Sequence, residues 1–180
     1  VGLGDGSDST RLSKALARIV SRQLGRRVLL LEAHGGKGTL NDFSTVGLGT
    51  LQEVLNGNIA LHDAHTQDAD SPLYVGRIAS TEDHLSQTLA HGGLPNLMQE
   101  LRHQFGLLLL DAPPMGASSD ALLSAKMLDA TVFTVDASRT RWQAARTAME
   151  QMDAQRAKTL GVLLYNQRYH IPRWIYDKLL

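Results

Sequence analysis

Hydrophobic and polar positions along the chain follow a helical period in some segments and form short continuous apolar runs in others. Over residues 10–24 apolar side chains recur every three or four positions, which predicts an amphipathic helix capped by Ser9 or Thr10, with Gly25 just past its end. The apolar run 27–31 that follows is typical of a strand buried on both faces of a sheet.

The same alternation continues to the end of the chain. Further strands are predicted over 73–78, 107–110, 131–135 and 160–165, and further helices over 50–56, 94–104, 119–128 and 139–155. Because helices alternate with apolar strands, we expect an α/β fold of three layers, with a mainly parallel central sheet and helices on both faces. Ligands bind such sheets at the carboxyl ends of the strands, so the loops after 31 and 110 are candidate site loops.

Composition narrows the class of protein. The chain has 180 residues, 43% of them hydrophobic and 20% charged, which is typical of one globular domain. Its formal net charge is zero, so nothing favours nucleic acid as a partner. It has no cysteine, which excludes disulfides and thiolate zinc sites. Its apolar runs are far shorter than the ~20 residues of a membrane-spanning helix, and we expect a cytoplasmic protein.

We expect a single domain over residues 1–180 and expect this domain to be a fragment. The chain opens at Val1-Gly2-Leu3-Gly4-Asp5-Gly6, directly on a glycine-rich loop. In a fold of this class a strand should precede such a loop. The sequence therefore predicts that the first strand is missing, with room for a larger N-terminal region before it.

The glycine-rich opening partly matches a phosphate-binding loop, G-x-x-x-x-G-K-[ST]. In that motif glycines let backbone N–H groups surround phosphate, the lysine neutralises charge and the hydroxyl binds magnesium. The match holds at Gly2 and Ser9, but Ser7 replaces the second glycine and Asp8 the lysine. The candidate phosphate-binding residues are Gly2, Gly4, Gly6, Ser7, Ser9 and Thr10. Alone, this match fits equally well a strand–helix turn that never held phosphate.

Asp8 determines the affinity that we expect of this loop. Losing the lysine contact forfeits roughly 1.5–3 kcal/mol. A carboxylate about 4 Å from phosphate adds repulsion on the order of 4 kcal/mol at an effective dielectric of about 20. The helix N-terminus returns only ~0.3–2 kcal/mol. If Asp8 points inward, affinity should fall about a thousandfold or more; if it turns to solvent, weak binding through backbone amides survives.

Two later strand ends carry a resemblance to a known family. The leucines 107–110 are followed by Asp111-Ala112-Pro113-Pro114, which resembles the Walker B motif of bacterial tyrosine kinases, D-[ST]-P-P after an apolar run. Glu32-Ala33-His34-Gly35-Gly36 stands where that family has D-x-D-x-R. Shorter matches extend the resemblance along the chain, at 46–51, 55–57, 119–122, 139–141, 160–166 and 171–176. The chain is similar to these kinases and, more broadly, to MinD/ParA-type P-loop ATPases.

The resemblance implies a nucleotide site that has lost essential residues. Active members bind Mg-ATP, phosphorylate a C-terminal tyrosine cluster between subunits of a ring, and work with a membrane partner in polysaccharide export. Carried over by position, Ser9 and Asp111 would lie beside magnesium and Glu32 would be a catalytic carboxylate. We interpret Asp8, Glu32, His34 and Asp111 as vestigial catalytic positions. No ATP, ADP or metal is expected to bind.

We therefore expect a non-catalytic scaffold or regulator of bacterial exopolysaccharide or capsule synthesis and export. It would act at the cytoplasmic face of the inner membrane, through contact with a membrane polysaccharide copolymerase, another export component or further copies of itself. The alternative is an active ATPase or tyrosine autokinase with Mg-ATP, in which Lys37, Lys14 or a partner's residue replaces the missing lysine. A third hypothesis is a positioning protein that dimerises with nucleotide.

Two further groups of residues have suggestive compositions. His62, Asp63 and His65 resemble metal ligands, but a solvated loop is the better interpretation. The C-terminal residues 168–178 mix basic and aromatic side chains. Such a segment docks on a partner or membrane surface, or folds back on its own core. Trp142 is expected to pack within the domain.

Overall fold

The computed structural model describes residues 2–3, 7–33, 40, 42–69, 71–80, 85–115 and 119–167, with backbone alone for Leu3, Ser7 and Asp8. The strands are β1 (Gly2–Leu3), β2 (Val28–Glu32), β3 (His65–Gln67), β4 (Leu73–Arg77), β5 (Leu107–Asp111), β6 (Thr131–Asp136) and β7 (Thr159–Tyr165). The helices are α1 (Ser7–Leu24), α2 (Leu51–Leu55), α3 (Leu85–Ala90), α4 (Leu94–Gln104), α5 (Asp120–Lys126) and α6 (Trp142–Ala154), with a 3-10 turn over Leu61–Ala64.

The described strands form two sheets that are parallel apart from β3. One sheet has the order β3-β4-β2-β5 and the other β1-β6-β7, with β3 antiparallel to β4. The N–H of Met115, which follows β5, donates to the carbonyl of Gly2 at 2.8 Å and so links the two sheets. The α/β class with a mainly parallel sheet is therefore confirmed. The pairing of Gly2–Leu3 with β6 places this short segment in a strand rather than in a loop.

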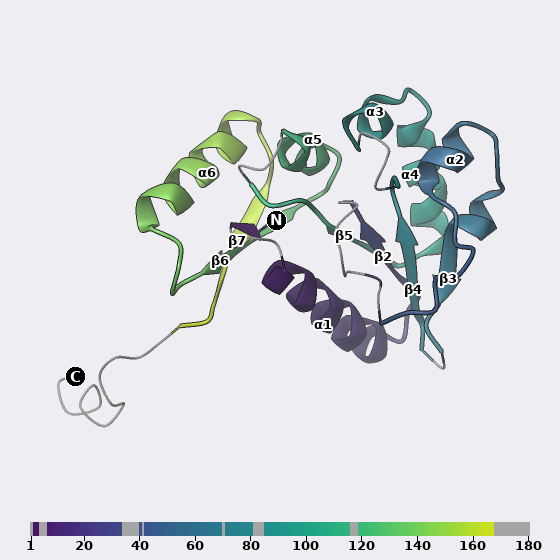
Figure 1. Ribbon diagram of the computed structural model, residues 1–180, viewed down its shortest axis with the longest axis horizontal. Coiled ribbons are helices and arrows are strands. Elements are labelled where there is room, and N and C mark those ends of the chain that lie inside the picture. The colour runs from purple at the N-terminus through teal and green to yellow at the C-terminus, as the bar shows by residue number, and fades with distance from the viewer. Residues whose placement is uncertain are drawn as a thin grey trace.

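Strand β2 explains why helices cover both faces of its sheet. Successive side chains of a strand point to opposite faces. Val28 and Leu30 pack with Ala17 of α1, whereas Leu29 and Leu31 pack against α2 and α4 on the other face. Figure 1 shows α1 on one side of the strands and the remaining helices on the other. An unbroken apolar run is what such a doubly covered strand requires.

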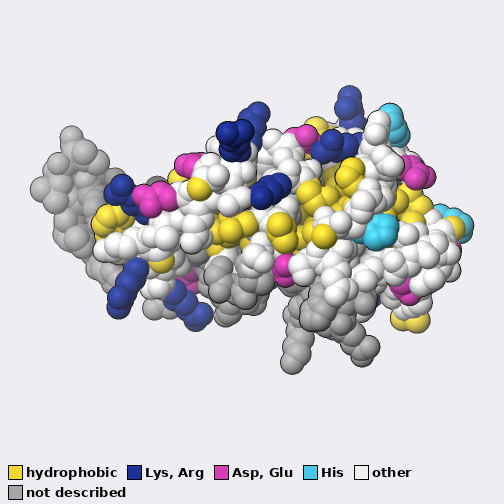
Figure 2. All heavy atoms as spheres, turned by 90° about the horizontal axis from the view of Figure 1, so that it is seen from above, with side chains coloured by type: hydrophobic (Ala, Val, Ile, Leu, Met, Phe, Trp, Pro, Cys, Tyr) yellow, Lys and Arg dark blue, Asp and Glu magenta, His cyan; other side chains and the backbone are white. Residues whose placement is uncertain are grey.

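The β6–β7 end of the molecule is covered less completely. Phe133 of β6 packs with Met152 of α6 and with Ala121 and Ala125 of α5. On the opposite face Val132 and Leu163 are exposed, as are Leu16 and Ile19 of α1. Figure 2 views the molecule from the side of α3, α5 and α6, where hydrophobic side chains lie among charged ones.

Several elements differ from the sequence predictions. The expected loop around His62 and His65 is a 3-10 turn followed by β3, and α3 was not predicted. The polar β3 is an edge strand, whose short sequence carries no alternating pattern. The leucines 107–110 are half-buried rather than fully buried, and β5 is an edge strand of its sheet among the described strands. Trp142 is 64% exposed rather than packed.

The length and hydropathy of each helix decide whether it could span a membrane. Among the helices within the described residues, none is both long and apolar enough to cross a lipid bilayer.

Candidate functional site

Three charged side chains stand in a row at the carboxyl ends of neighbouring strands. Glu32, the last residue of β2, is in register with Arg77 of β4 on one side and with Asp111 of β5 on the other. Alternate residues of a strand share a face of the sheet. Because Val28 and Leu30 face α1, Glu32 also lies on the face that α1 covers. The two predicted acidic residues are therefore cross-strand neighbours, about 5 Å apart by the usual strand spacing.

Asp111 connects the sheet to the first turns of α1. It is 2% exposed. Its Oδ2 accepts a hydrogen bond from the Thr10 hydroxyl at 2.8 Å, and its Oδ1 accepts one from the Ser13 hydroxyl at 3.0 Å. The backbone carbonyl of Asp111 also accepts from the N–H of Ala33 at 3.0 Å. The structure thus brings together the helix after the glycine-rich segment and the strand end that resembles Walker B.

Glu32 is stabilised from the opposite side. Its side chain is 4% exposed, and Oε2 accepts from Arg77 Nε at 3.2 Å. A buried carboxylate costs several kcal/mol unless it is paired and hydrogen-bonded. Arg77 offsets the charge of Glu32 while the hydroxyl groups of Thr10 and Ser13 satisfy Asp111. Two acidic side chains can therefore lie side by side under α1.

Gly2 and Ser9 form a tight corner between β1 and α1. A Cβ on Gly2 would lie 2.9 Å from both Cβ and Oγ of Ser9, and 3.2 Å from Thr134 Oγ1 of β6. Ser9 is itself buried. Any larger residue at position 2 would have to push α1 away from the sheet. The magnesium roles of Ser9 and Asp111 remain predictions, since the described hydroxyl bonds to Asp111 come from Thr10 and Ser13.

Some predicted site residues are not described. Gly4, Gly6, His34 and Lys37 lie outside the described residues, and Ser7 and Asp8 are described only as backbone in the first turn of α1.

Lys14, considered above as a replacement lysine, is bound elsewhere. Its Nζ lies 2.9 Å from Asp42 Oδ2, and its side chain is buried. The hydrogen bond from Lys14, together with its charge, holds the pKa of Asp42 below its usual value. Lys14 also stands seven residues after the first residue of α1, two turns from the phosphate loop. This engagement weighs against its use as a phosphate ligand.

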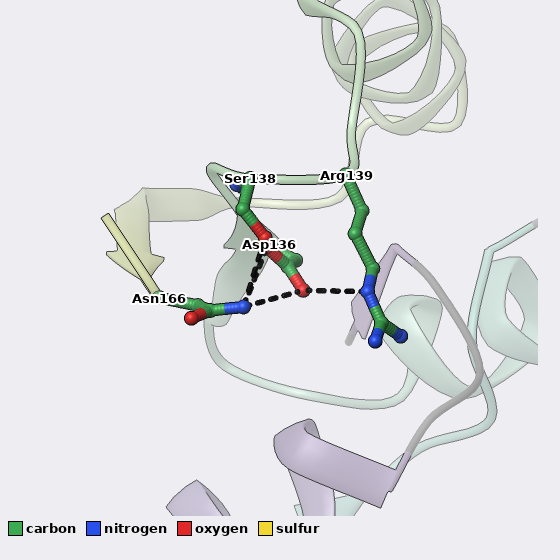
Figure 3. A network of polar contacts seen from close by, with 4 residues as sticks. All are labelled: Asp136, Ser138, Arg139 and Asn166. Atoms are coloured by element: carbon green, nitrogen blue, oxygen red, sulfur yellow. Dashed lines mark hydrogen bonds and ion pairs between the residues drawn. The ribbon is translucent and has the colours of Figure 1, made fainter. Parts of the chain in front are cut away.

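Sequence reasoning missed a second polar cluster at the carboxyl ends of β6 and β7. Asp136 Oδ1 accepts from the N–H of Ser138 at 2.8 Å and from its hydroxyl at 2.7 Å, and both Asp136 oxygens lie 3.3 Å from Asn166 Nδ2 (Figure 3). Arg139 Nε lies 3.9 Å from Oδ2. The hydrogen bonds from Ser138, followed by those from Asn166 and the charge of Arg139, lower the pKa of Asp136. The sequence did contain one signal for this cluster: Asp136 directly follows an apolar run and stands two residues before Ser138, a pattern typical of an Asp side chain that accepts from a nearby backbone N–H.

The oxygen atoms around Asp111 can be compared with those that magnesium and nucleotide require. A carboxylate with two hydroxyl groups is a donor set of the kind magnesium accepts, so the site fits the metal. The phosphate side fits poorly, because the motif's lysine position is Asp8 and the nearby lysine is bound to Asp42. When bound, Mg-ATP would supply a transferable phosphoryl group, and Asp111 with Thr10 would be placed to hold the metal.

The two histidines considered as candidate metal ligands, His62 and His65, lie in different environments. His62 Nε2 lies 3.3 Å from Asp63 Oδ1 at the surface. The ring of His65 packs edge-on against Tyr74 and Phe105, at centroid distances of 5.8 and 5.3 Å. Burial, then the charges of Arg27 and His62, lower the pKa of His65. His65 thus belongs to an aromatic cluster of the core.

Comparison with known proteins gives a consistent result, although no family model matches the chain. The tyrosine-protein kinase CpsD of Streptococcus agalactiae is 26% identical over 89% of this chain and 70% of its own length. The tyrosine-protein kinase YwqD of Bacillus subtilis is 24% identical over 92% of this chain and 69% of its own length. A putative tyrosine-protein kinase in the cps region of Klebsiella pneumoniae is 27% identical over 73% of this chain and 18% of its own length.

Solved structures share the fold. The VpsO kinase domain superposes with a TM-score of 0.75, at 24% identity over 92% of this chain and 80% of that one. MinD from Pyrococcus horikoshii, complexed with Mg-ADP, has a TM-score of 0.64 at 19% identity over 99% of this chain and 74% of that one. Sequence and fold therefore agree that this chain is similar to the bacterial tyrosine kinases and has a MinD-type P-loop fold.

Proposed function

We propose that this chain is a non-catalytic scaffold or regulator of bacterial exopolysaccharide or capsule synthesis and export. The observation that carries the proposal is Asp8 at the lysine position, in the first turn of a helix whose own Lys14 is committed to Asp42. A P-loop that presents a carboxylate to phosphate loses several kcal/mol of binding energy. The Asp111, Thr10 and Ser13 contacts then serve to hold α1 on the sheet.

The proposed setting follows from the relatives. These relatives are tyrosine kinases, one of them a putative kinase in a cps region, and the chimerical protein CapA2B2 has the same fold with a TM-score of 0.82 at 20% identity. We propose that this chain contacts a membrane polysaccharide copolymerase or another export component at the cytoplasmic face of the inner membrane. Contact with further copies of itself is a second mode of assembly under this proposal.

The test is isothermal titration of the protein with Mg-ATP and Mg-ADP, alongside the double variant Ser7→Gly/Asp8→Lys. We expect no binding at micromolar concentrations for the natural chain. Restoring the glycine and lysine should strengthen affinity by a factor on the order of a thousand, the inverse of the loss expected from Asp8. Glu100→Lys, at an exposed position of α4, changes the charge equally and should leave binding unchanged.

The second candidate function is an active tyrosine autokinase or ATPase. The observation in its favour is the carboxylate–hydroxyl set at Asp111, which suits magnesium. Micromolar binding of Mg-ATP with measurable turnover, or a phosphotyrosine mass shift after incubation with ATP, would refute the scaffold proposal and establish this alternative.

A further inference from the structure

One face of β7 carries apolar side chains that the described elements leave partly exposed. Leu160, Val162 and Leu164 alternate along the strand and so share a face. Val162 and Leu164 line the groove beneath α6, which identifies that face as the one toward α6. The three side chains are 68%, 41% and 58% exposed. Uncovered apolar side chains in a continuous row mark an interaction surface.

Val162 and Leu164 lie on one wall of a groove whose other wall is α6. Trp142 and Met149 line the wall on α6, and the cavity volume is about 480 Å³. Figure 1 shows α6 running alongside β6 and β7 at one end of the molecule. A largely exposed tryptophan at the edge of an apolar groove is typical of a surface that anchors a peptide.

The groove also has a charge that constrains its occupant. Arg146, Glu150 and Asp153 line it, and Arg146 Nε is bound to Glu150 Oε1 at 2.8 Å. One basic and two acidic side chains leave an acidic excess on the α6 wall. An apolar segment with basic residues matches both features of the groove.

We propose that residues 168–180 of this same chain dock in the α6–β7 groove. This segment has apolar residues at intervals of three and four, namely Ile171, Trp174, Ile175 and Leu179. It also has three basic residues, Arg168, Arg173 and Lys178, against one acidic residue, Asp177. The apolar residues match the groove walls, and the basic excess matches the acidic excess that Asp153 leaves beside the Arg146–Glu150 pair.

The point where the described chain ends favours this occupant. Gln167 is three residues beyond Leu164, so the segment begins beside the groove. Asn166 has φ 56°, a left-handed conformation that ends the extended path of β7. As a helix, which their spacing of three and four favours, the thirteen residues span about 20 Å, and the seven residues of β7 span about 23 Å. The segment is therefore long enough to cover most of the length of β7. This docking is independent of nucleotide binding and of the function proposed above.

Tryptophan fluorescence of the full chain tests the proposal. The chain has two tryptophans, so Trp142→Phe leaves Trp174 as the reporter and keeps an aromatic ring on the groove wall. We expect Trp174 emission to lie to the blue of its value in urea, with acrylamide quenching reduced severalfold. Met149→Asp should restore quenching toward the urea value. The matched substitution Leu16→Asp, at an exposed position of α1, should not. Equal quenching of Trp174 in the native and urea-unfolded chains would overturn the proposal.

Disulfide trapping provides a second test that does not depend on the aspartate variant folding. The natural chain has no cysteine, so engineered pairs react without background. Met149→Cys/Ile175→Cys should close an intramolecular disulfide under mild oxidation at every protein concentration. Leu16→Cys/Ile175→Cys should not. Disulfide-linked dimers that increase with concentration, without the intramolecular product, would overturn docking within one chain in favour of exchange between copies.

Discussion

Arg77 and Glu32 form an ion pair in which the carboxylate is buried and the guanidinium is one-third exposed. Removing the arginine charge leaves Glu32 beside Asp111 with less compensation. We expect Arg77→Met to lower the free energy of unfolding by about 1–3 kcal/mol, less than the ~3–5 kcal/mol of a fully buried pair. Urea unfolding measures this difference.

Two further variants distinguish the effect of the lost charge of Arg77 from the effect of its lost packing. Adding Glu32→Gln to Arg77→Met should recover part of the loss, because a neutral amide needs no counter-charge. Arg102→Met breaks an exposed pair with Asp129 and should cost little. A double variant that is less stable than the sum of the single variants would contradict this account of the pair.

For individual residues, the positions of the candidate acids Glu32 and Asp111 could be predicted from the sequence, whereas their hydrogen-bonding partners could not. Glu32 and Asp111 each end an apolar run, and parallel strands align such ends. Nothing in the sequence paired Arg77 with Glu32, or Ser13 with Asp111, because these contacts depend on strand order and on the rotation of α1. The contact of Asn166 with Asp136 was missed for the same reason, since the two residues are 30 positions apart in the sequence.

Among the elements, the hairpin of β3 and β4 carries a pH-dependent contact. His65 packs with Tyr74 and Phe105, and Arg27 lies over both rings, 4.5 and 4.8 Å from their centroids. Because its pKa is lowered in the fold from 6.5, the unfolded chain binds the proton more tightly. Stability should therefore fall as pH decreases below 6.5.

Urea unfolding between pH 7.5 and 5.5 measures how the free energy of unfolding depends on pH, and two histidine variants identify the group responsible. His65→Phe, which cannot take up a proton, should flatten the profile over that interval, whereas the exposed His103→Phe should leave it as in the natural chain. A profile that stays equally steep in His65→Phe would assign the proton uptake to another group. The sequence could not predict this element, because the polar residues 65–67 lack the apolar pattern of a strand.

For the whole molecule, the two sheets should differ in local stability. Strand β2 is paired on both edges and buried throughout, whereas β7 is the outer strand of its sheet and largely exposed. Amide groups open to solvent most easily where few apolar contacts must break.

We therefore expect backbone amides of β7 to exchange with deuterium at least about tenfold faster than those of β2. Peptide-resolved exchange at neutral pH gives both rates in one experiment. Equal protection of β2 and β7 would indicate that the two sheets open only together. The alternation of helices and strands predicted the layers of the molecule, but exposed apolar residues on β7 could not be distinguished by sequence from buried ones.

The corner between Gly2 and Ser9 has a consequence for how such sequences evolve. No side chain fits at position 2 without displacing α1, whether or not phosphate is ever bound. Selection for folding alone would then preserve this glycine, with or without selection for catalysis. A glycine in a phosphate-loop pattern is therefore evidence of architecture, and the residue at position 8 is the better guide to phosphate chemistry.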